Sequence, residues 1–198
     1  MENDTPNYPN WFDSQKYNFE NHLTKFKGKP NLKFLQVGVY TGDASDWLLT
    51  SILLDPSSTL TDVDTWQGSD EREHEAMDFD AIYGIYLNRM DKYENVMSIK
   101  GDSTYVLPNL KEKYDFIYID GDHTEKAVYR DATDAWPLLK SQGILAFDDY
   151  LWGQDVHPSL RPMLAIDRFL EEKQGEYELL SQGYQVWIQK KWEKDPHS

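Results

Sequence analysis

Short apolar segments alternate with longer, helix-like stretches along most of the chain, and this alternation restricts the fold more than any other feature of the sequence. A strand followed by a helix and then by another strand normally runs parallel to its successor, with the helix packed on one face of the sheet. Residues 177–182 and 184–191 flank a glycine-containing turn and are typical of an antiparallel hairpin. The sequence therefore predicts a doubly wound α/β fold, with a seven-stranded, mostly parallel sheet that ends in an antiparallel C-terminal hairpin strand. The other expected strands are residues 33–39, 58–64, 95–102, 114–120 and 143–149, and the expected helices are residues 10–27, 44–55, about 70–91, 126–140 and about 160–173.

Length and composition indicate one domain. The 198 residues are enough to bury a core without splitting in two, and 39% of them are hydrophobic. No internal repeat, low-complexity tract or linker divides the sequence. We expect a single domain over residues 1–198, in which residues 1–31 form an N-terminal helical lid or cover and residues 32–191 form the core.

The charge and the lack of cysteine exclude several classes of function. Without cysteine the chain has no disulfide, no thiolate–zinc site and no cysteine nucleophile. Its 20 basic and 35 acidic side chains give a formal charge of −15, which is the wrong sign for a nucleic-acid partner. The first residues show no signal-peptide pattern, and no apolar run reaches the roughly 20 residues of a membrane helix. We expect a cytoplasmic protein with a small-molecule ligand and no membrane partner, and the sequence leaves a homo-oligomeric state open.

Two of the predicted strands run directly into acidic residues. The segment YDFIYIDGDHT (114–124) ends in Asp120, Gly121, Asp122 and His123, and GILAFDDYLW (143–152) contains Asp148 and Asp149. Ligands of open α/β sheets bind beyond the carboxyl ends of the strands, where these residues are expected to lie. The acids are therefore expected to line one rim of the sheet.

Asp120, Asp148 and Asp149 would lie on adjacent strands and would repel one another strongly unless a cation lay among them. Carboxylate oxygens suit Mg²⁺, Ca²⁺ or Mn²⁺, so a divalent metal site is the favoured interpretation. Asp122 and His123 are the candidates for moving a proton, because one is a carboxylate beside this site and the other titrates near neutrality. In the alternative interpretation some of the acids cap helices or pair with arginines, namely Arg130, Arg161 or Arg168.

The segment LQVGVYTGDAS (35–45) places Gly38 and Gly42 between a strand and a helix, where glycine lets the backbone approach a ligand. A dinucleotide fingerprint would need glycine at two positions that hold Tyr40 and Asp43. Asp43 would also repel a phosphate, whereas a zwitterion tolerates that acid better. The turn therefore disfavours a pyrophosphate cradle, although an ordinary strand-to-helix turn is an equally good interpretation of the two glycines alone.

Acidic residues also follow the second and third predicted strands. Asp64 could accept both hydrogen bonds of a ribose diol, and Trp66 could stack on an adenine ring. Asp102 and Ser103 follow the third strand, where a carboxylate could accept the adenine amino group. Each acid taken singly has an ordinary alternative, and Asp102 is a plausible helix N-cap. Their recurrence at successive strand ends favours a nucleoside site.

Together these motifs resemble the class I S-adenosylmethionine-dependent methyltransferases, and specifically the metal-dependent O-methyltransferases. LQVGVYTGDAS is similar to the first motif of that family, and YIDGDHT and FDDYLW are similar to its fourth and fifth motifs. The pairing of DGD with DDY is closest to the branch that methylates sugar hydroxyls of macrolide and aminocoumarin antibiotics, and catechol and caffeoyl-CoA O-methyltransferases are more distant. The resemblance covers about residues 33–190 and implies a Rossmann-like fold.

The resemblance also implies roles for individual residues. Asp120, Asp148 and Asp149 correspond to the metal ligands. In the sugar branch the residue matching Asp122 is the proposed base, whereas in the catechol and plant enzymes a lysine base stands at the position of His123. Gln36 stands where the family usually has an acid. The cofactor-binding residues that we expect are Gly38, Tyr40, Thr41, Gly42, Asp64, Trp66, Asp102, Ser103 and Asp120.

We therefore expect an S-adenosylmethionine-dependent, divalent-metal-assisted O-methyltransferase that acts on a small-molecule hydroxyl, such as a sugar or a vicinal diol of catechol type. Trp11, Phe12, residues 66–90 and residues 150–160 are expected to form the acceptor walls. Two alternatives stay open. One is a metal-independent methyltransferase with His123 as its base, and the other is a non-catalytic module that binds S-adenosylmethionine.

Overall fold

The computed structural model describes residues 8–69, 74 and 76–192, and its centre is a seven-stranded sheet in the order β3-β2-β1-β4-β5-β7-β6. The first five strands are parallel, and β7 is antiparallel to both β5 and β6. The predicted doubly wound α/β fold with an antiparallel hairpin is therefore confirmed. The strands are β1 (Lys33–Val37), β2 (Thr59–Asp64), β3 (Val96–Lys100), β4 (Tyr114–Ile119), β5 (Leu139–Phe147), β6 (Tyr177–Gln182) and β7 (Val186–Lys190).

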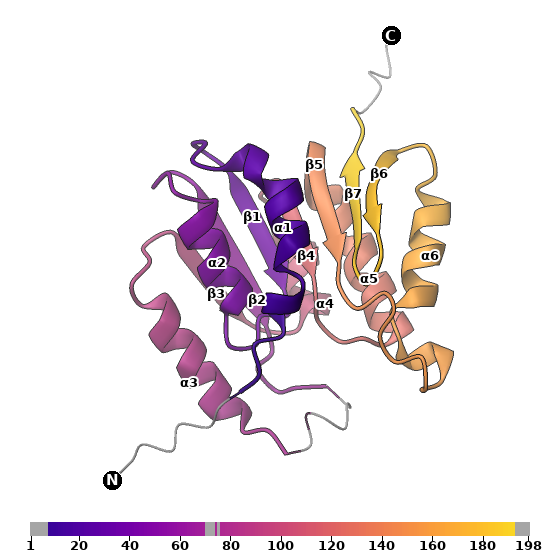
Figure 1. Ribbon diagram of the computed structural model, residues 1–198, viewed down its shortest axis with the longest axis horizontal. Coiled ribbons are helices and arrows are strands. Elements are labelled where there is room, and N and C mark those ends of the chain that lie inside the picture. Colours follow the sequence, from indigo (N-terminus) through magenta and orange to yellow (C-terminus); the bar gives the residue numbers. More distant parts are fainter. Residues whose placement is uncertain (1–7, 70–73, 75, 193–198) are drawn as a thin grey trace.

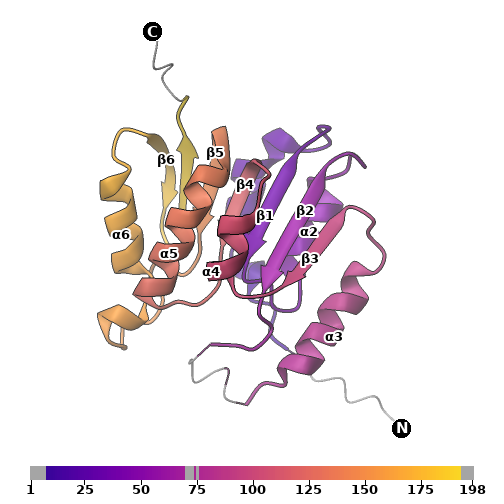
Figure 2. The ribbon, with the colours of Figure 1, turned by 180° about the vertical axis from the view of Figure 1, so that it is seen from behind.

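Helices cover both faces of the sheet (Figures 1 and 2). One face carries α1 (Lys16–Leu23), α2 (Asp43–Ser51) and α3 (Phe79–Met90), and the opposite face carries α4 (Ser103–Val106), α5 (Glu125–Ala135) and α6 (Met163–Glu172). Short 3-10 turns complete the helical elements at residues 12–14, 24–26, 107–109, 136–138 and 158–160. None of the helices in the described part of the chain has the length and apolar character needed to cross a membrane.

Several helices differ from the sequence prediction at their ends: α1 is limited to Lys16–Leu23 and α2 ends at Ser51, and the physical reason is clear for α3 and α5. α3 begins at Phe79 and not near residue 70, because Asp78 is its N-cap and accepts a hydrogen bond from Ala81 N at 3.0 Å. Residues 70–73 and 75 of the predicted helix lie outside the described residues. α5 ends at Ala135, since Pro137 has no N–H to continue the helix, and a 3-10 turn follows.

The inner strands bury apolar side chains on both faces, as expected for a parallel sheet covered by helices. Phe34, Phe116 and Ile144 point into the layer beneath α1–α3, whereas their neighbours Leu35, Ile117 and Leu145 point into the layer beneath α4–α6. The strand order reverses at β1, which lies between β2 and β4. Such a reversal opens a crevice at the carboxyl ends of the central strands, and this crevice is where open α/β sheets bind ligands.

Candidate active site

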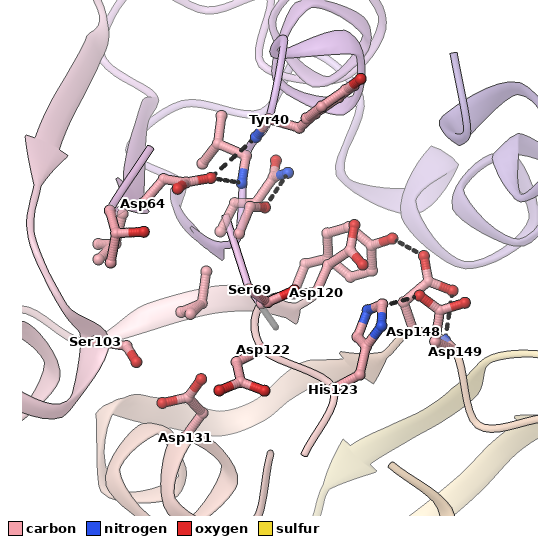
Figure 3. A pocket seen from close by; sticks show the side chains of 18 of the residues that line it. Tyr40, Asp64, Ser69, Ser103, Asp120, Asp122, His123, Asp131, Asp148 and Asp149 are labelled. Atoms are coloured by element: carbon pink, nitrogen blue, oxygen red, sulfur yellow. Dashed lines mark hydrogen bonds and ion pairs between the residues drawn. The ribbon is translucent and has the colours of Figure 1, made fainter. Parts of the chain in front are cut away.

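A cavity of about 700 Å³ lies at the carboxyl ends of β1, β2, β4 and β5. It is bordered by the turn after β1, the ends of β2 and β4, and the acids after β5 (Figure 3). Part of the N-terminal segment also lines it. Thr41 and Gly42 are in the turn but are not among the lining residues. The predicted site residues that do line the cavity are Gly38, Tyr40, Asp64, Trp66, Asp102, Ser103, Asp120, Asp122, His123, Asp148 and Asp149.

The turn after β1 depends on Gly38. This residue has a φ of 80°, and a Cβ added to it would lie 1.9 Å from the carbonyl oxygen of Asp120. Only glycine can therefore hold the turn in direct contact with the end of β4. This close approach brings the predicted cofactor turn and the predicted metal ligands together on one cavity wall.

Asp64 fixes the other side of the same turn. Its Oδ2 accepts hydrogen bonds from Val39 N at 2.6 Å and Tyr40 N at 3.0 Å, and its Oδ1 accepts one from Trp66 N at 2.6 Å. Each carboxylate oxygen can accept two hydrogen bonds, so Oδ1 keeps acceptor capacity toward the cavity. The carboxylate thus orders the loops around it, and its predicted contact with a ribose stays a prediction.

Gln36, which stands where the resembled family has an acid, is buried beneath the turn. Its Nε2 donates to Gly38 O at 2.9 Å, and its Oε1 accepts from Ser45 Oγ at 3.2 Å. A neutral amide can both donate and accept here, whereas a carboxylate could only accept. Gln36, in place of the acid of the resembled family, is therefore compatible with an ordered turn.

Trp66 and Asp102 both have structural contacts, and of these only the helix cap made by Asp102 was anticipated from the sequence. The Trp66 ring is only 2% exposed, lies 4.6 Å from Tyr83 and 4.7 Å from Tyr86, and donates from Nε1 to Tyr40 O. This packing leaves little of the ring for stacking on an adenine, and that role stays a prediction. Asp102 caps α4 by accepting from Thr104 N at 2.8 Å, as its alternative interpretation proposed, and it also faces the cavity.

The acids after β4 and β5 meet at the other end of the cavity. Ligand atoms of Asp120, His123 and Asp149 all lie within 4.8 Å of one another, and His123 Nε2 is 2.9 Å from Asp149 Oδ2. Asp148 does not belong to this group. Its Oδ2 accepts from the Tyr118 hydroxyl, and its Oδ1 accepts from Asp149 N at 2.8 Å. The structure therefore groups His123, in place of Asp148, with two of the three predicted ligands.

The electrostatics of these acids follow from their enclosure. Burial, with the charges of Asp148 and Asp149, raises the pKa of Asp120 well above its usual range. Burial and the charge of Asp149 likewise raise the pKa of Asp148 to about 6, against the opposing hydrogen bond from Tyr118. Crowded carboxylates of this kind gain most from a cation that neutralises them together.

Two of the three arginines that were considered as partners of these acids pair with other residues. Arg130 pairs with Asp134 at 2.8 Å and Arg168 pairs with Glu172 at 3.0 Å.

Asp122, the other proton-transfer candidate, is exposed on the cavity wall and accepts from Thr124 N at 2.8 Å.

The lining residues that sequence reasoning missed include Tyr118 and Asp131. Tyr118 precedes Asp120 by two positions and therefore shares its face of β4, which is the signal that could have found it. Asp131 is only 3% exposed and lies on the buried side of α5 among Val128, Ala132 and Ala135. Burial raises its pKa to about 7, and Asp102 adds to the increase. A single acid on the apolar face of a predicted helix is the sequence signal that could have found Asp131.

Comparison with known families decides the class of protein. A family model described as a methyltransferase domain matches residues 35–150, from β1 to the acids after β5, which is more than half of the chain. The chain belongs to this methyltransferase family. It is an S-adenosylmethionine-dependent methyltransferase, and the match spans both the glycine turn and the acids of the cavity.

Solved structures share the fold of this methyltransferase at low sequence identity. The O-methyltransferase TomG from Streptomyces achromogenes, involved in tomaymycin synthesis and solved with S-adenosylmethionine, is 16% identical over 81% of this chain and 73% of its own, with a TM-score of 0.61. A Clostridium thermocellum protein proposed to be an rRNA methylase is 13% identical over 94% of this chain and 99% of its own, with a TM-score of 0.65.

The MycE methyltransferase of mycinamycin biosynthesis was solved with Mg, S-adenosylhomocysteine and mycinamycin VI. It is 13% identical over 96% of this chain and has a TM-score of 0.64, but the match covers 52% of its own chain, so this chain spans about half its length. These likenesses establish the fold and leave the methyl acceptor open.

The cavity suits the cofactor of the family in its charge and its backbone. Eight aspartates line it, a wall that would repel a pyrophosphate but favours a cationic sulfonium. The backbone at Gly38 and Tyr40 takes positive φ angles of 80° and 55° and runs directly along the cavity. The residues present therefore fit S-adenosylmethionine better than a dinucleotide.

Proposed function

We propose that this methyltransferase transfers a methyl group to a hydroxyl of a small molecule, such as a sugar or a vicinal diol of catechol type, with the help of a divalent metal ion. The observation that carries the proposal is the convergence of Asp120, His123 and Asp149 within 4.8 Å on a wall of the cavity. The likeness to TomG and to MycE, which was solved with Mg, supports it. The net charge of −15 argues against an RNA acceptor.

The two ends of the cavity are assigned different tasks in this proposal. The turn at Gly38 and Tyr40, with Asp64, would hold the ribose and methionine parts of the cofactor, and Asp102 and Ser103 would border the adenine. Thr41 and Gly42 would act by shaping the turn, since neither lines the cavity. Residues 8–31, of which Trp11 and Phe12 line the cavity, would form the cover of the acceptor.

Asp120 and Asp149 would be metal ligands, with Asp148 or His123 as the third. Two carboxylates and an imidazole suit Mn²⁺, whereas three carboxylates suit Mg²⁺ or Ca²⁺. Asp148 would need to release the Tyr118 hydroxyl to take part, and His123 would need to release Asp149. Loss of metal affinity in Asp148→Asn but not in His123→Asn would identify Asp148 as the ligand, and the reverse result would identify His123.

When bound, the cofactor supplies a methyl group on a sulfonium and the metal ion polarises an acceptor oxygen. The proposed transfer would break the carbon–sulfur bond, form a carbon–oxygen bond and release the proton of the acceptor hydroxyl. Asp122, which is exposed to the cavity, or His123 would accept that proton. The walls would hold the acceptor oxygen in line with the methyl carbon, which is the main contribution that positioning makes to such a displacement.

A metal-independent reaction is the second candidate, because His123 Nε2 and Asp149 Oδ2 already form a pair at 2.9 Å. A carboxylate beside an imidazole stabilises its protonated form, and this would let His123 take the proton of the acceptor hydroxyl without any metal. Sustained transfer after complete chelation of divalent ions, together with its loss in His123→Gln, would favour this candidate.

The proposal is tested by calorimetric titration with S-adenosylmethionine, with and without Mg²⁺, followed by diols and catechols as a third component. We expect cofactor binding that does not depend on metal and acceptor binding that does. Acceptor binding and turnover that survive chelation would contradict the metal-assisted reaction. Cofactor binding with neither metal affinity nor turnover would indicate a non-catalytic binding module.

A further inference from the structure

The charge of the cavity wall is strongly one-sided. Among the described lining residues there are eight aspartates and two histidines, but no lysine or arginine. Asp43 alone of these aspartates pairs with an arginine, at 2.5 Å from Arg89, within the part of the chain that the structure describes. The lining aspartates are Asp43, Asp64, Asp102, Asp120, Asp122, Asp131, Asp148 and Asp149.

The proposed ligands do not remove this excess of negative charge. Burial raises the pKa of Asp120, Asp131 and Asp148, so these three are left out of the charge balance. Four other lining aspartates have no lysine or arginine partner among the described residues, against one positive charge on the sulfonium and two on a divalent ion. A phosphate, sulfate or carboxylate on the acceptor would find no basic side chain in this wall, and only the metal ion and the sulfonium could offset its loss of hydration. A protonated amine would instead be attracted by the wall.

Aromatic rings provide a second feature that suits a cation. Trp11 lies 4.6 Å from Tyr40 and is 43% exposed, and Trp152 lies 4.8 Å from the His123 ring, so two tryptophans border the cavity near the turn and near the acids. Ring faces attract alkylammonium groups, and most strongly those of tryptophan. Acids and tryptophans on one wall are a combination that recognises amines.

We infer that the acceptor site selects by charge, taking a hydroxylated acceptor that bears a protonated amine in preference to a neutral one and excluding acceptors with a carboxylate or phosphate. The inference rests on the proposed function, because it concerns the acceptor of that same reaction. It narrows the substrate class from any small hydroxyl compound to amine-bearing diols.

Four probes separate the effect of charge from the effect of the hydroxyls. Dopamine and 3,4-dihydroxyphenylacetate share a vicinal diol and differ in charge, and phenethylamine and phenylacetate are the same pair without hydroxyls. Each is titrated calorimetrically into the protein with S-adenosylhomocysteine and Mg²⁺. Within each pair we expect the amine to bind at least about tenfold more tightly than the carboxylate. The ratio should shrink as salt is raised, because the charges are screened.

The comparison of amine with carboxylate and the comparison of probes with and without hydroxyls can fail separately. If dopamine binds no better than phenethylamine, chelation by the diol fails while charge selection stands. If the carboxylate binds as tightly as the amine in both pairs, or if neither amine binds detectably, the inference is overturned.

A charge introduced into the wall gives a second test. Gln15 lines the cavity directly before α1, and Asn21 is exposed on α1 without lining the cavity. Gln15→Lys should lower the amine-to-carboxylate ratio several-fold by weakening amine binding and strengthening carboxylate binding, whereas the matched control Asn21→Lys should leave the ratio unchanged. Equal ratios in the two variants would contradict the inference.

Discussion

Two rows of residues cross the sheet next to each other, and their acids differ: the acid of the deeper row is buried outside the cavity, whereas the acids of the row at the rim line the cavity. The deeper row joins Ser98, Asp62, Gln36 and Tyr118 across β3, β2, β1 and β4, and each is paired in register with the next. The row at the rim lies two residues further along the strands and contains Asp64, Gly38 and Asp120. Whether an acid serves the core or the cavity therefore depends on its position along the strand: Asp62 is in the deeper row, and Asp64 and Asp120 are at the rim.

Asp62 shows what the deeper row does. Its side chain is fully buried and accepts from the Tyr86 hydroxyl at 2.9 Å, and that hydroxyl also lies 2.5 Å from Ser98 Oγ. Burial raises the pKa of Asp62 to about 7, against the opposing hydrogen bonds from Ser45 and Tyr86. This network connects α3 to the sheet, and Asp62 is not among the residues that line the cavity.

The largest difference between the rows is expected in catalysis. Asp120→Asn keeps the shape of the side chain but removes a rim carboxylate, so methyl transfer should fall on the order of 10³-fold while cofactor binding stays within a few-fold. Turnover and calorimetric binding of S-adenosylhomocysteine check this expectation. A loss of transfer in Asp62→Asn as large as in Asp120→Asn would remove the distinction between the rows.

The contact between the turn after β1 and the end of β4 should matter next. Gly38→Ala places a methyl group against the Asp120 carbonyl at a positive φ and should lower the free energy of unfolding by more than about 2 kcal/mol. Chemical denaturation measures this change. Gly84→Ala is the matched control, because Gly84 is in α3 with open space around it, and it should be neutral or stabilising by about 0.5–1 kcal/mol.

A smaller effect of the deeper row is expected in the way that the free energy of unfolding depends on pH. Folded Asp62 keeps its proton up to about pH 7, whereas in the unfolded chain it loses the proton near its ordinary value of 3.8. Its contribution to stability is therefore complete below that value and is lost as the pH rises to about 7. Asp62→Asn should flatten this loss and stabilise the protein at pH 8 by on the order of 2 kcal/mol. Denaturation at pH 5 and 8 tests this, with the exposed Asp155→Asn as control, and an unchanged pH dependence would contradict it.

The sheet and the rim could be predicted from the sequence because both follow from local patterns. β2 ends at Asp64, and β4 and β5 end directly before Asp120 and Asp148, so these acids could be placed on one edge without knowledge of the helices. Parallel strands share their carboxyl ends, and this rule alone brought distant segments together.

Contacts that depend on how helices dock could not be predicted. Trp66 was expected to face an adenine, but its ring packs against Tyr83 and Tyr86, which depends on the position of α3. The third member of the metal group depends on side-chain directions at the ends of β4 and β5. There His123 points to Asp149, and Asp148 points to Tyr118.

The most direct test of the central claim is titration of Mn²⁺ into the protein with S-adenosylhomocysteine bound, followed by electron paramagnetic resonance. We expect one ion to bind per chain, its affinity to fall strongly in Asp120→Asn, and Asp62→Asn to bind it as the natural protein does. Failure of the natural protein to bind an ion, or equal affinity in Asp120→Asn, would contradict the claim that the rim acids form a metal site.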